Sequence, residues 1–151
     1  MKFLITGGAG FIGSAVTRNL ISNSKHSVLN VDKLTYASNL NTLDSVSNSD
    51  RYSFRQVDIC RSDQVKEIFE AYAPDVIMHL AAESHVDRSI DNPKEFLDTN
   101  IYGTYVLLEE ARNIFSKGKK VLFHHVSTDE VYGDLHDIEN AFSENSSYEP
   151  S

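Results

Sequence analysis

Three glycines, each three residues from the next, separate an apolar run at the start of the chain from an amphipathic stretch. The apolar run covers residues 2–5, and the glycines are Gly7, Gly10 and Gly13. Residues 11–21 then repeat apolar side chains at the spacing of one helix face. A short apolar strand that turns through glycine directly into a helix is typical of the first unit of a nucleotide-binding α/β fold.

The same alternation continues along the chain. Apolar, strand-like runs occupy residues 27–31, 52–57, 75–80 and 120–126, and a helix with Ser62 as its N-cap is expected to end at Pro74. Residues 33–50 are polar and are expected to form a long loop. The repeated strand–helix–strand order predicts a Rossmann-type doubly wound parallel sheet with helices on both faces.

Composition narrows the class of partner. The net charge is −8 and the pI is about 5.1, whereas nucleic acid or an anionic membrane surface requires a basic face. We therefore expect neither as a partner. The single cysteine, Cys60, fits a reducing, cytoplasmic compartment. The six histidines lack the spacing and acidic neighbours of a metal site, so no metal is expected.

The glycines and one acidic residue predict the cofactor. Gly7 permits a tight turn, Gly10 lets the backbone approach a pyrophosphate, and Gly13 lets the helix pack close to the sheet. Asp32 ends the second strand, where a carboxylate can accept both ribose hydroxyls of an adenosine and would repel a 2′-phosphate. The sequence therefore favours NAD over NADP, although the neighbouring Lys33 weakens that preference.

A hydroxyl and two adjacent carboxylates follow the last predicted strand. Thr128, Asp129 and Glu130 stand in the segment 127–133, and ligands of parallel sheets bind beyond the carboxyl ends of the strands. Burial and repulsion between neighbouring carboxyl groups can separate their pKa values, so that one acts as acid and the other as base. We interpret the three residues as catalytic.

The predicted helix over residues 93–115 is apolar on more than one face. A helix that covers a sheet needs only one buried stripe. The additional apolar residues predict that a second face of the helix is also buried, and we expect homodimerisation through this helix.

With these motifs placed, the chain resembles the extended short-chain dehydrogenase/reductase family along its whole length. Within that family it is most similar to the sugar-nucleotide 4,6-dehydratases that act on dTDP-glucose. The segments that carry the resemblance are residues 6–13, 32–37 and 80–89, Asn100 with Gly103 and Thr104, and residues 127–133. The acidic pair after Thr128 distinguishes such dehydratases from the related 4-epimerases.

The resemblance implies a residue set for each ligand. Besides the glycines, NAD is expected to contact Phe11, Ile12, Asp32, Lys33, Leu34, Thr35, Asp58, Ile59, Leu80, Ala81, Ala82, Glu83, Ser84 and Thr99. The nucleotide-sugar substrate is expected to contact Ser84 and Thr128, with Thr128 bonded to the C4 hydroxyl. Asp129 is expected to donate a proton and Glu130 to accept one. The resemblance gives no role to His85, Asp87 or Arg88.

One family motif is missing. No tyrosine in the chain is followed by lysine four residues later, although the family's Tyr-x-x-x-Lys pair starts the oxidation at C4. We therefore interpret residues 1–151 as an incomplete NAD-binding domain, an N-terminal piece that lacks the sugar-nucleotide-binding domain and is inactive alone. The alternatives are another nucleotide-sugar enzyme of the family, a 4-epimerase or decarboxylase, or a non-catalytic NAD-binding module.

Overall fold

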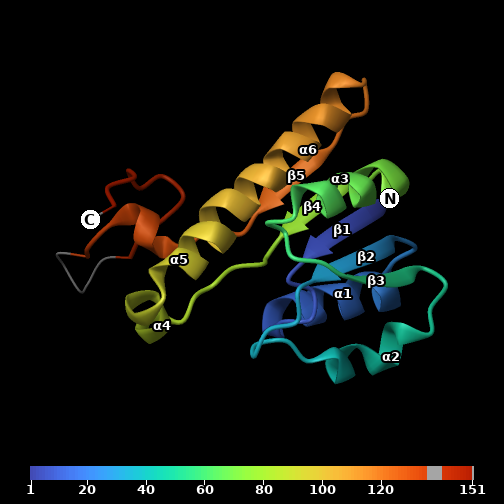
Figure 1. Cartoon of the computed structure of the whole chain (residues 1–151), viewed down its shortest axis with the longest axis horizontal. Helices are drawn as coiled ribbons and strands as arrows, with labels where there is room; N and C mark the ends of the chain where they lie inside the picture. The colour runs from blue at the N-terminus through green and yellow to red at the C-terminus, as the bar shows by residue number, and fades with distance from the viewer. Residues whose placement is uncertain (136–140, 151) are drawn as a thin grey trace.

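The computed structural model describes residues 1–135 and 141–150 and contains one five-stranded sheet. All four strand pairs are parallel, and the spatial order is β3-β2-β1-β4-β5. The strands are β1 (Lys2–Thr6), β2 (Ser27–Asp32), β3 (Tyr52–Gln56), β4 (Val76–His79) and β5 (Leu122–His125) (Figure 1). The chain order reverses direction between β1 and β4, which places a crevice at the carboxyl ends of these two strands.

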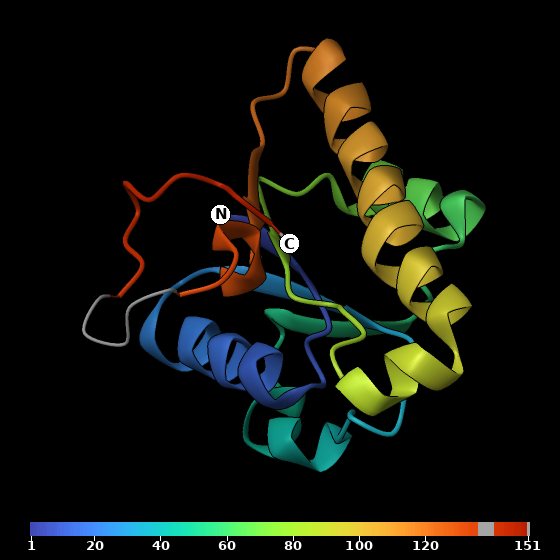
Figure 2. The same ribbon diagram turned by 90° about the vertical axis from the view of Figure 1, so that its left-hand side faces the viewer.

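Helices cover both faces of the sheet, as Figure 2 shows. One face carries α1 (Phe11–Asn23), the 3₁₀ turn η1 (Leu40–Leu43) and α2 (Asp44–Ser47). The other carries α3 (Ser62–Tyr72) and α6 (Thr104–Ser116), which pack against each other. The predicted Rossmann-type fold with a parallel, doubly covered sheet is confirmed.

Two apolar cores explain why the strands read as continuous apolar runs. In β1, Leu4 points to the core beneath α3 and α6, whereas Phe3 and Ile5 point to the core beneath α1 and α2. In β4, Ile77 and Val76 divide in the same way. Side chains of a strand alternate between faces, so a sheet covered on both sides needs apolar residues at successive positions.

Two local predictions were wrong, and one short helix was not predicted. The polar stretch 33–50 contains η1 and α2, because Leu43 and Val46 are buried against the sheet. Ser62 is the first helical residue of α3 rather than its cap, since a turn from Asp58 to Arg61 already leads into the helix. A short helix, α4 (Val86–Asp91), lies in a segment for which no helix was predicted.

The predicted helix 93–115 is one helical segment with a wider central turn. It begins as α5 (Pro93–Phe96), continues as the π-helical segment η2 (Leu97–Gly103) and ends as α6. Gly103 is needed in this segment because an added Cβ would lie 2.6 Å from the Ile59 side chain. α6 buries Val106, Leu107 and Ala111 against the sheet.

Within residues 1–135 and 141–150, no helix is long and apolar enough to cross a membrane. In the same part of the chain, no three His, Cys, Asp or Glu side chains gather closely enough to hold a metal ion.

Candidate cofactor and active site

A cavity of about 100 Å³ opens at the carboxyl ends of β1, β2 and β4. Eleven residues predicted to contact the cofactor line it. They are Gly7, Gly10, Asp32, Lys33, Thr35, Ile59, Leu80, Ala81, Ala82, Glu83 and Thr99. The cavity therefore lies at the position in the fold where doubly wound sheets bind nucleotides.

The glycine turn forms one wall of the cavity and leaves no room for side chains. Gly7 adopts a φ of +69°, and an added Cβ would lie 2.8 Å from the Ala81 backbone. An added Cβ on Gly13 would lie 2.2 Å from the Gly7 carbonyl oxygen. Close packing of α1 against β1 thus requires glycine at both positions. Gly10 lines the cavity and directly precedes α1, and no side chain caps that helix, so its first N–H groups have no capping partner.

Asp32 is buried at the end of β2 and is fixed by three donors. Its Oδ2 accepts a hydrogen bond from the Ala9 N–H at 3.0 Å. Its Oδ1 accepts from the Leu34 N–H at 2.9 Å and from the Ser38 hydroxyl at 2.8 Å. A carboxylate offers about four acceptor positions, so one acceptor position of Asp32 remains free for a ligand.

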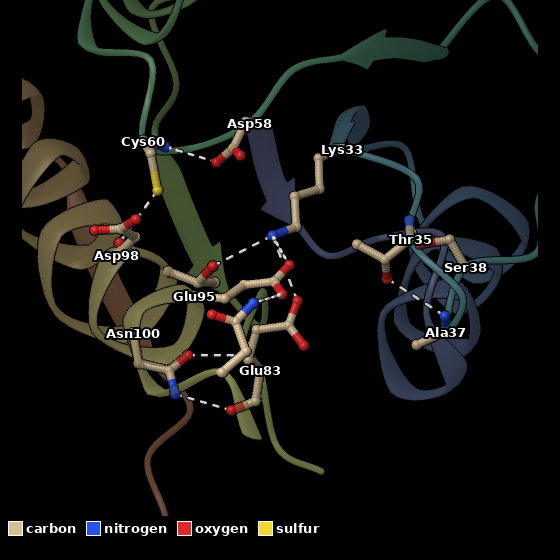
Figure 3. Close-up of polar contacts among 12 residues, drawn as sticks. Lys33, Thr35, Ala37, Ser38, Asp58, Cys60, Glu83, Glu95, Asp98 and Asn100 are labelled. Carbon is tan, nitrogen blue, oxygen red and sulfur yellow. Dashed lines mark hydrogen bonds and ion pairs between the residues drawn. The ribbon is translucent and has the colours of Figure 1, made fainter. Parts of the chain in front are cut away.

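Lys33 crosses the cavity from β2 to the elements that follow β4 (Figure 3). Its ammonium donates to Thr99 Oγ1 at 3.3 Å and lies 3.4 Å from Glu83 Oε1 and 3.6 Å from Glu95 Oε1. Burial lowers the pKa of Lys33, but the carboxylates of Asp58, Glu83 and Glu95 outweigh it and raise that pKa above its ordinary value. The cation is therefore charged at neutral pH.

The segment after β4 is held by Asn100 of the π-helical turn. The Asn100 amide accepts from the Glu83 N–H at 2.9 Å and donates to the Glu83 carbonyl at 2.8 Å. This two-point clamp fixes the backbone of the 80–84 segment beside the cavity, and Figure 3 shows both bonds. Single-turn π-helical insertions occur often at functional sites, and here the wider turn carries both Thr99 and Asn100.

The other predicted cofactor residues lie outside this cavity. Phe11 is 95% exposed and Ile12 is also exposed, both at the start of α1. Gly13 packs against the turn, and Ser84 is exposed. Leu34 and Asp58 line an adjoining cavity of about 560 Å³ that Lys33 and Thr35 also line. The contacts of all these residues with NAD stay predictions.

Cys60 lines an adjoining cavity together with Lys33 and Thr99. Its thiol donates to the Asp98 carbonyl at 3.1 Å, and burial raises its pKa to about 12. A thiol with so high a pKa carries almost no thiolate at neutral pH.

Thr128, Asp129 and Glu130 follow β5 as predicted, but they do not line the cavity around the glycine turn. Asp129 and Glu130 open the 3₁₀ turn η3 (Asp129–Tyr132), and the Thr128 hydroxyl caps it by accepting from the Glu130 N–H at 3.3 Å. All three side chains are exposed. The turn supplies the bend that lets two adjacent carboxylates leave the strand direction.

The sequence reasoning missed four lining residues, Val31, Ala37, Ser38 and Val57. Val31 and Val57 are the last residues of two predicted strands and could have been found from that position alone. Ala37 and Ser38 reach the cavity because the 33–38 segment folds back, which the Thr35 N–H to Ser38 Oγ bond of 3.1 Å fixes. Arg88 also gains a contact, since its guanidinium carbon lies 3.8 Å from the centre of the Tyr36 ring.

The family model described as GDP-mannose 4,6 dehydratase matches residues 4–151. The chain belongs to this family. Among curated members, the dTDP-glucose 4,6-dehydratase of Salmonella typhimurium strain LT2 is 56% identical over 164 aligned positions, which cover 100% of this chain and 45% of the relative. The chain therefore spans less than half the length of the GDP-mannose 4,6 dehydratase family members that it matches.

Two solved dehydratase structures are similar to this chain in both sequence and fold. DesIV, a dTDP-glucose 4,6-dehydratase from Streptomyces venezuelae crystallised with NAD and TYD, is 39% identical, with a TM-score of 0.86 over 99% of this chain and 46% of DesIV. The dTDP-glucose 4,6-dehydratase RfbB from Bacillus anthracis, crystallised with NAD, is 36% identical, with a TM-score of 0.80 over 100% of this chain and 44% of RfbB.

Proposed function

We propose that this chain carries the NAD-binding half of a dTDP-glucose 4,6-dehydratase, which converts dTDP-glucose to dTDP-4-keto-6-deoxyglucose. The observation that carries the proposal is the cavity bounded by the glycine turn, Asp32 and Glu83, combined with 56% identity to dTDP-glucose 4,6-dehydratases. The soluble enzyme is expected to work in the cytoplasm.

The cavity fits NAD on its own geometry. Glycine at Gly7 and Gly13 lets the turn pack tightly between β1, the 80–81 segment and α1. The N-terminus of α1, a helix of 13 residues, offers N–H groups and a positive dipole end to an anion. Asp32 retains acceptor capacity for a ribose hydroxyl, and a 2′-phosphate would meet its charge.

A bound NAD would supply the hydride acceptor for C4 of the sugar and the hydride donor for C6. A ketone at C4 would acidify the neighbouring C5–H, so that Glu130 can accept that proton, and C5 regains a proton when hydride reaches C6. Asp129 protonates the departing C6 hydroxyl, so that water leaves across C5 and C6, while Thr128 holds the C4 oxygen. Each proton transfer contributes on the order of 10²–10⁴-fold in rate.

Turnover also needs a group that deprotonates the C4 hydroxyl. No tyrosine in this sequence is followed by lysine four residues later, so residues 1–151 hold no Tyr-x-x-x-Lys pair for that step. We propose that the 151-residue chain binds NAD but forms no 4-keto-6-deoxy sugar, because it lacks the pair that would start the oxidation at C4.

A second copy of the chain is proposed as the partner of the outer face of the long helix. Its exposed apolar side chains recur at helical spacing opposite the buried stripe. They are Leu97, Ile101, Tyr105, Leu108 and Phe115. Pairing two such stripes would remove them from water.

The test uses a chimera in which this chain replaces the aligned part of the Salmonella typhimurium enzyme. We expect the chimera to form dTDP-4-keto-6-deoxyglucose, and Glu130→Gln and Asp129→Asn each to lower kcat by about 10²–10⁴-fold. In the isolated chain, Asp32→Ala should abolish tight NAD binding without a gain for NADP. A chimera that forms a 4-epimer instead, or full activity of both carboxylate variants, would contradict the proposal.

A further inference from the structure

Lys33 stands directly after Asp32, where a cation would suit a phosphate on the 2′ position of the ribose. Arg or Lys near this position is what lets such folds accept NADP. The ammonium is not free here. It lies 3.4 Å from Glu83 Oε1 and donates to Thr99 Oγ1 at 3.3 Å, on the side of the cavity opposite β2.

Glu83 is the buried ion-pair partner of this cation, although the Asp58 carboxylate also attracts it. The Glu83 side chain is 6% exposed, whereas that of Glu95, the second carboxylate that forms an ion pair with Lys33, is 45% exposed. A buried carboxylate is costly unless an opposite charge lies beside it, while an exposed pair is worth little. If the Lys33 ammonium moved away, the Glu83 carboxylate would be left buried without an opposite charge. The Lys33–Glu83 pair is therefore more stable than the exposed Lys33–Glu95 pair.

Glu83 also cannot follow Lys33 toward the ribose. Both backbone groups of Glu83 are bonded to the Asn100 amide, at 2.9 Å and 2.8 Å. The carboxylate therefore emerges from a fixed point on the β4 side of the cavity (Figure 3). The Lys33 side chain therefore has to extend across the cavity to reach the Glu83 carboxylate.

We propose that Glu83 is a specificity-determining residue: it holds the Lys33 ammonium away from the ribose and so prevents it from binding a 2′-phosphate. The proposal rests on the proposed NAD-binding function and extends it. Asp32 repels the phosphate of NADP, and Glu83 removes the neighbouring cation that would otherwise offset this repulsion. Lys33 is thereby compatible with a preference for NAD.

The test compares the ratio of the NADP and NAD dissociation constants, measured by titration calorimetry on the whole chain. A purely structural role for the ion pair would weaken both cofactors together and leave the ratio unchanged. Glu83→Gln keeps the shape of the side chain and removes its charge. We expect it to lower the ratio about tenfold in favour of NADP, as the freed ammonium makes a charge-assisted contact with the phosphate.

Two controls sharpen the result. Glu95→Gln removes the exposed partner and should change the ratio less than about twofold. Adding Lys33→Ala to Glu83→Gln should restore the original ratio. An unchanged ratio in Glu83→Gln, with NAD binding intact, would overturn the inference and leave the proposed function standing.

A further variant avoids any dependence on how well Glu83→Gln folds. Lys33→Met in the otherwise unchanged chain should leave the ratio as it is, because the lysine makes no phosphate contact there. A ratio that rises against NADP in this variant would show that Lys33 is already available to a phosphate, and would overturn the inference. Failure of the unchanged chain to bind NAD would instead refute the proposed function itself.

Discussion

Nε2 of His79 lies 2.9 Å from Oγ1 of Thr104, which joins the end of β4 to the helix packed above it. The Thr104 hydroxyl donates its own proton to the Asn100 carbonyl at 2.7 Å, so it can only accept from His79. On the other side of the ring, Nδ1 lies 2.7 Å from the Thr6 hydroxyl, whose oxygen also accepts from the Ala81 N–H. These contacts place a proton on Nε2, and burial keeps the imidazole neutral at pH 7, so that Nδ1 accepts from the Thr6 hydroxyl.

This arrangement predicts that acid destabilises the protein through His79. Burial, with a smaller effect of the nearby His125, lowers the pKa of His79 to about 4, against an ordinary value of 6.5. The unfolded chain therefore takes up the proton first. Stability should be complete above pH 6.5 and should fall as the pH drops toward 4, by up to about 3 kcal/mol from this group.

Urea unfolding at pH 7 and pH 5 measures this loss. His79→Gln cannot titrate, so the difference in unfolding free energy between the two pH values should shrink, even if the variant is less stable at both. Long-range ¹⁵N–¹H NMR should show the Nε2–H tautomer at pH 7. An equal pH difference in the two proteins, or the Nδ1–H tautomer, would contradict the assignment.

Gly13→Ala should destabilise the chain by roughly 2 kcal/mol, because the new methyl group would overlap the Gly7 carbonyl oxygen and push α1 away from β1. Gly118→Ala is the matched control. Gly118 has a φ of +87° but open space around the added Cβ, so only backbone strain of about 1 kcal/mol applies. Thermal unfolding that ranks Gly118→Ala as the more damaging change would show that close packing at the glycine turn is not the constraint.

The outer stripe of the long helix predicts self-association. Sedimentation velocity should show a dimer for the unchanged chain and a monomer when Tyr105 and Leu108 are both replaced by Glu, since charges would then lie in the apolar contact. Ile90→Glu, an exposed apolar site on α4, should leave the dimer intact. A monomer at every concentration of the unchanged chain would remove the proposal.

Cys60 should resist alkylation in the folded protein. With its pKa raised to about 12 by burial, the thiol should react with iodoacetamide at pH 8 at least about a hundredfold more slowly than in the urea-unfolded chain. Because the chain has a single cysteine, mass spectrometry reports this site alone. Rapid labelling of the folded protein would mean that the bond to the Asp98 carbonyl opens readily.

Local patterns were sufficient for the fold and for much of the cavity. Strand runs, helix stripes and the glycine turn depend on side-chain period and backbone sterics, which act over a few residues. Parallel strands then bring their carboxyl ends to one edge, so Gly7, Asp32 and Leu80 could be placed together from sequence. The same reasoning missed η1 and α2, where Leu43 and Val46 are buried by the sheet rather than by any local periodicity.

The amino-acid sequence by itself determined the doubly wound sheet and the position of the nucleotide cavity. Only the tertiary structure decided that Lys33 meets Glu83 and Thr99, that Asn100 clamps Glu83, and that His79 is enclosed between Thr6 and Thr104. These partners are far apart in the chain, and their distances follow from the strand register and from how the π-helical turn sits on the sheet. Neither is encoded in a local pattern, because both arise from packing between elements.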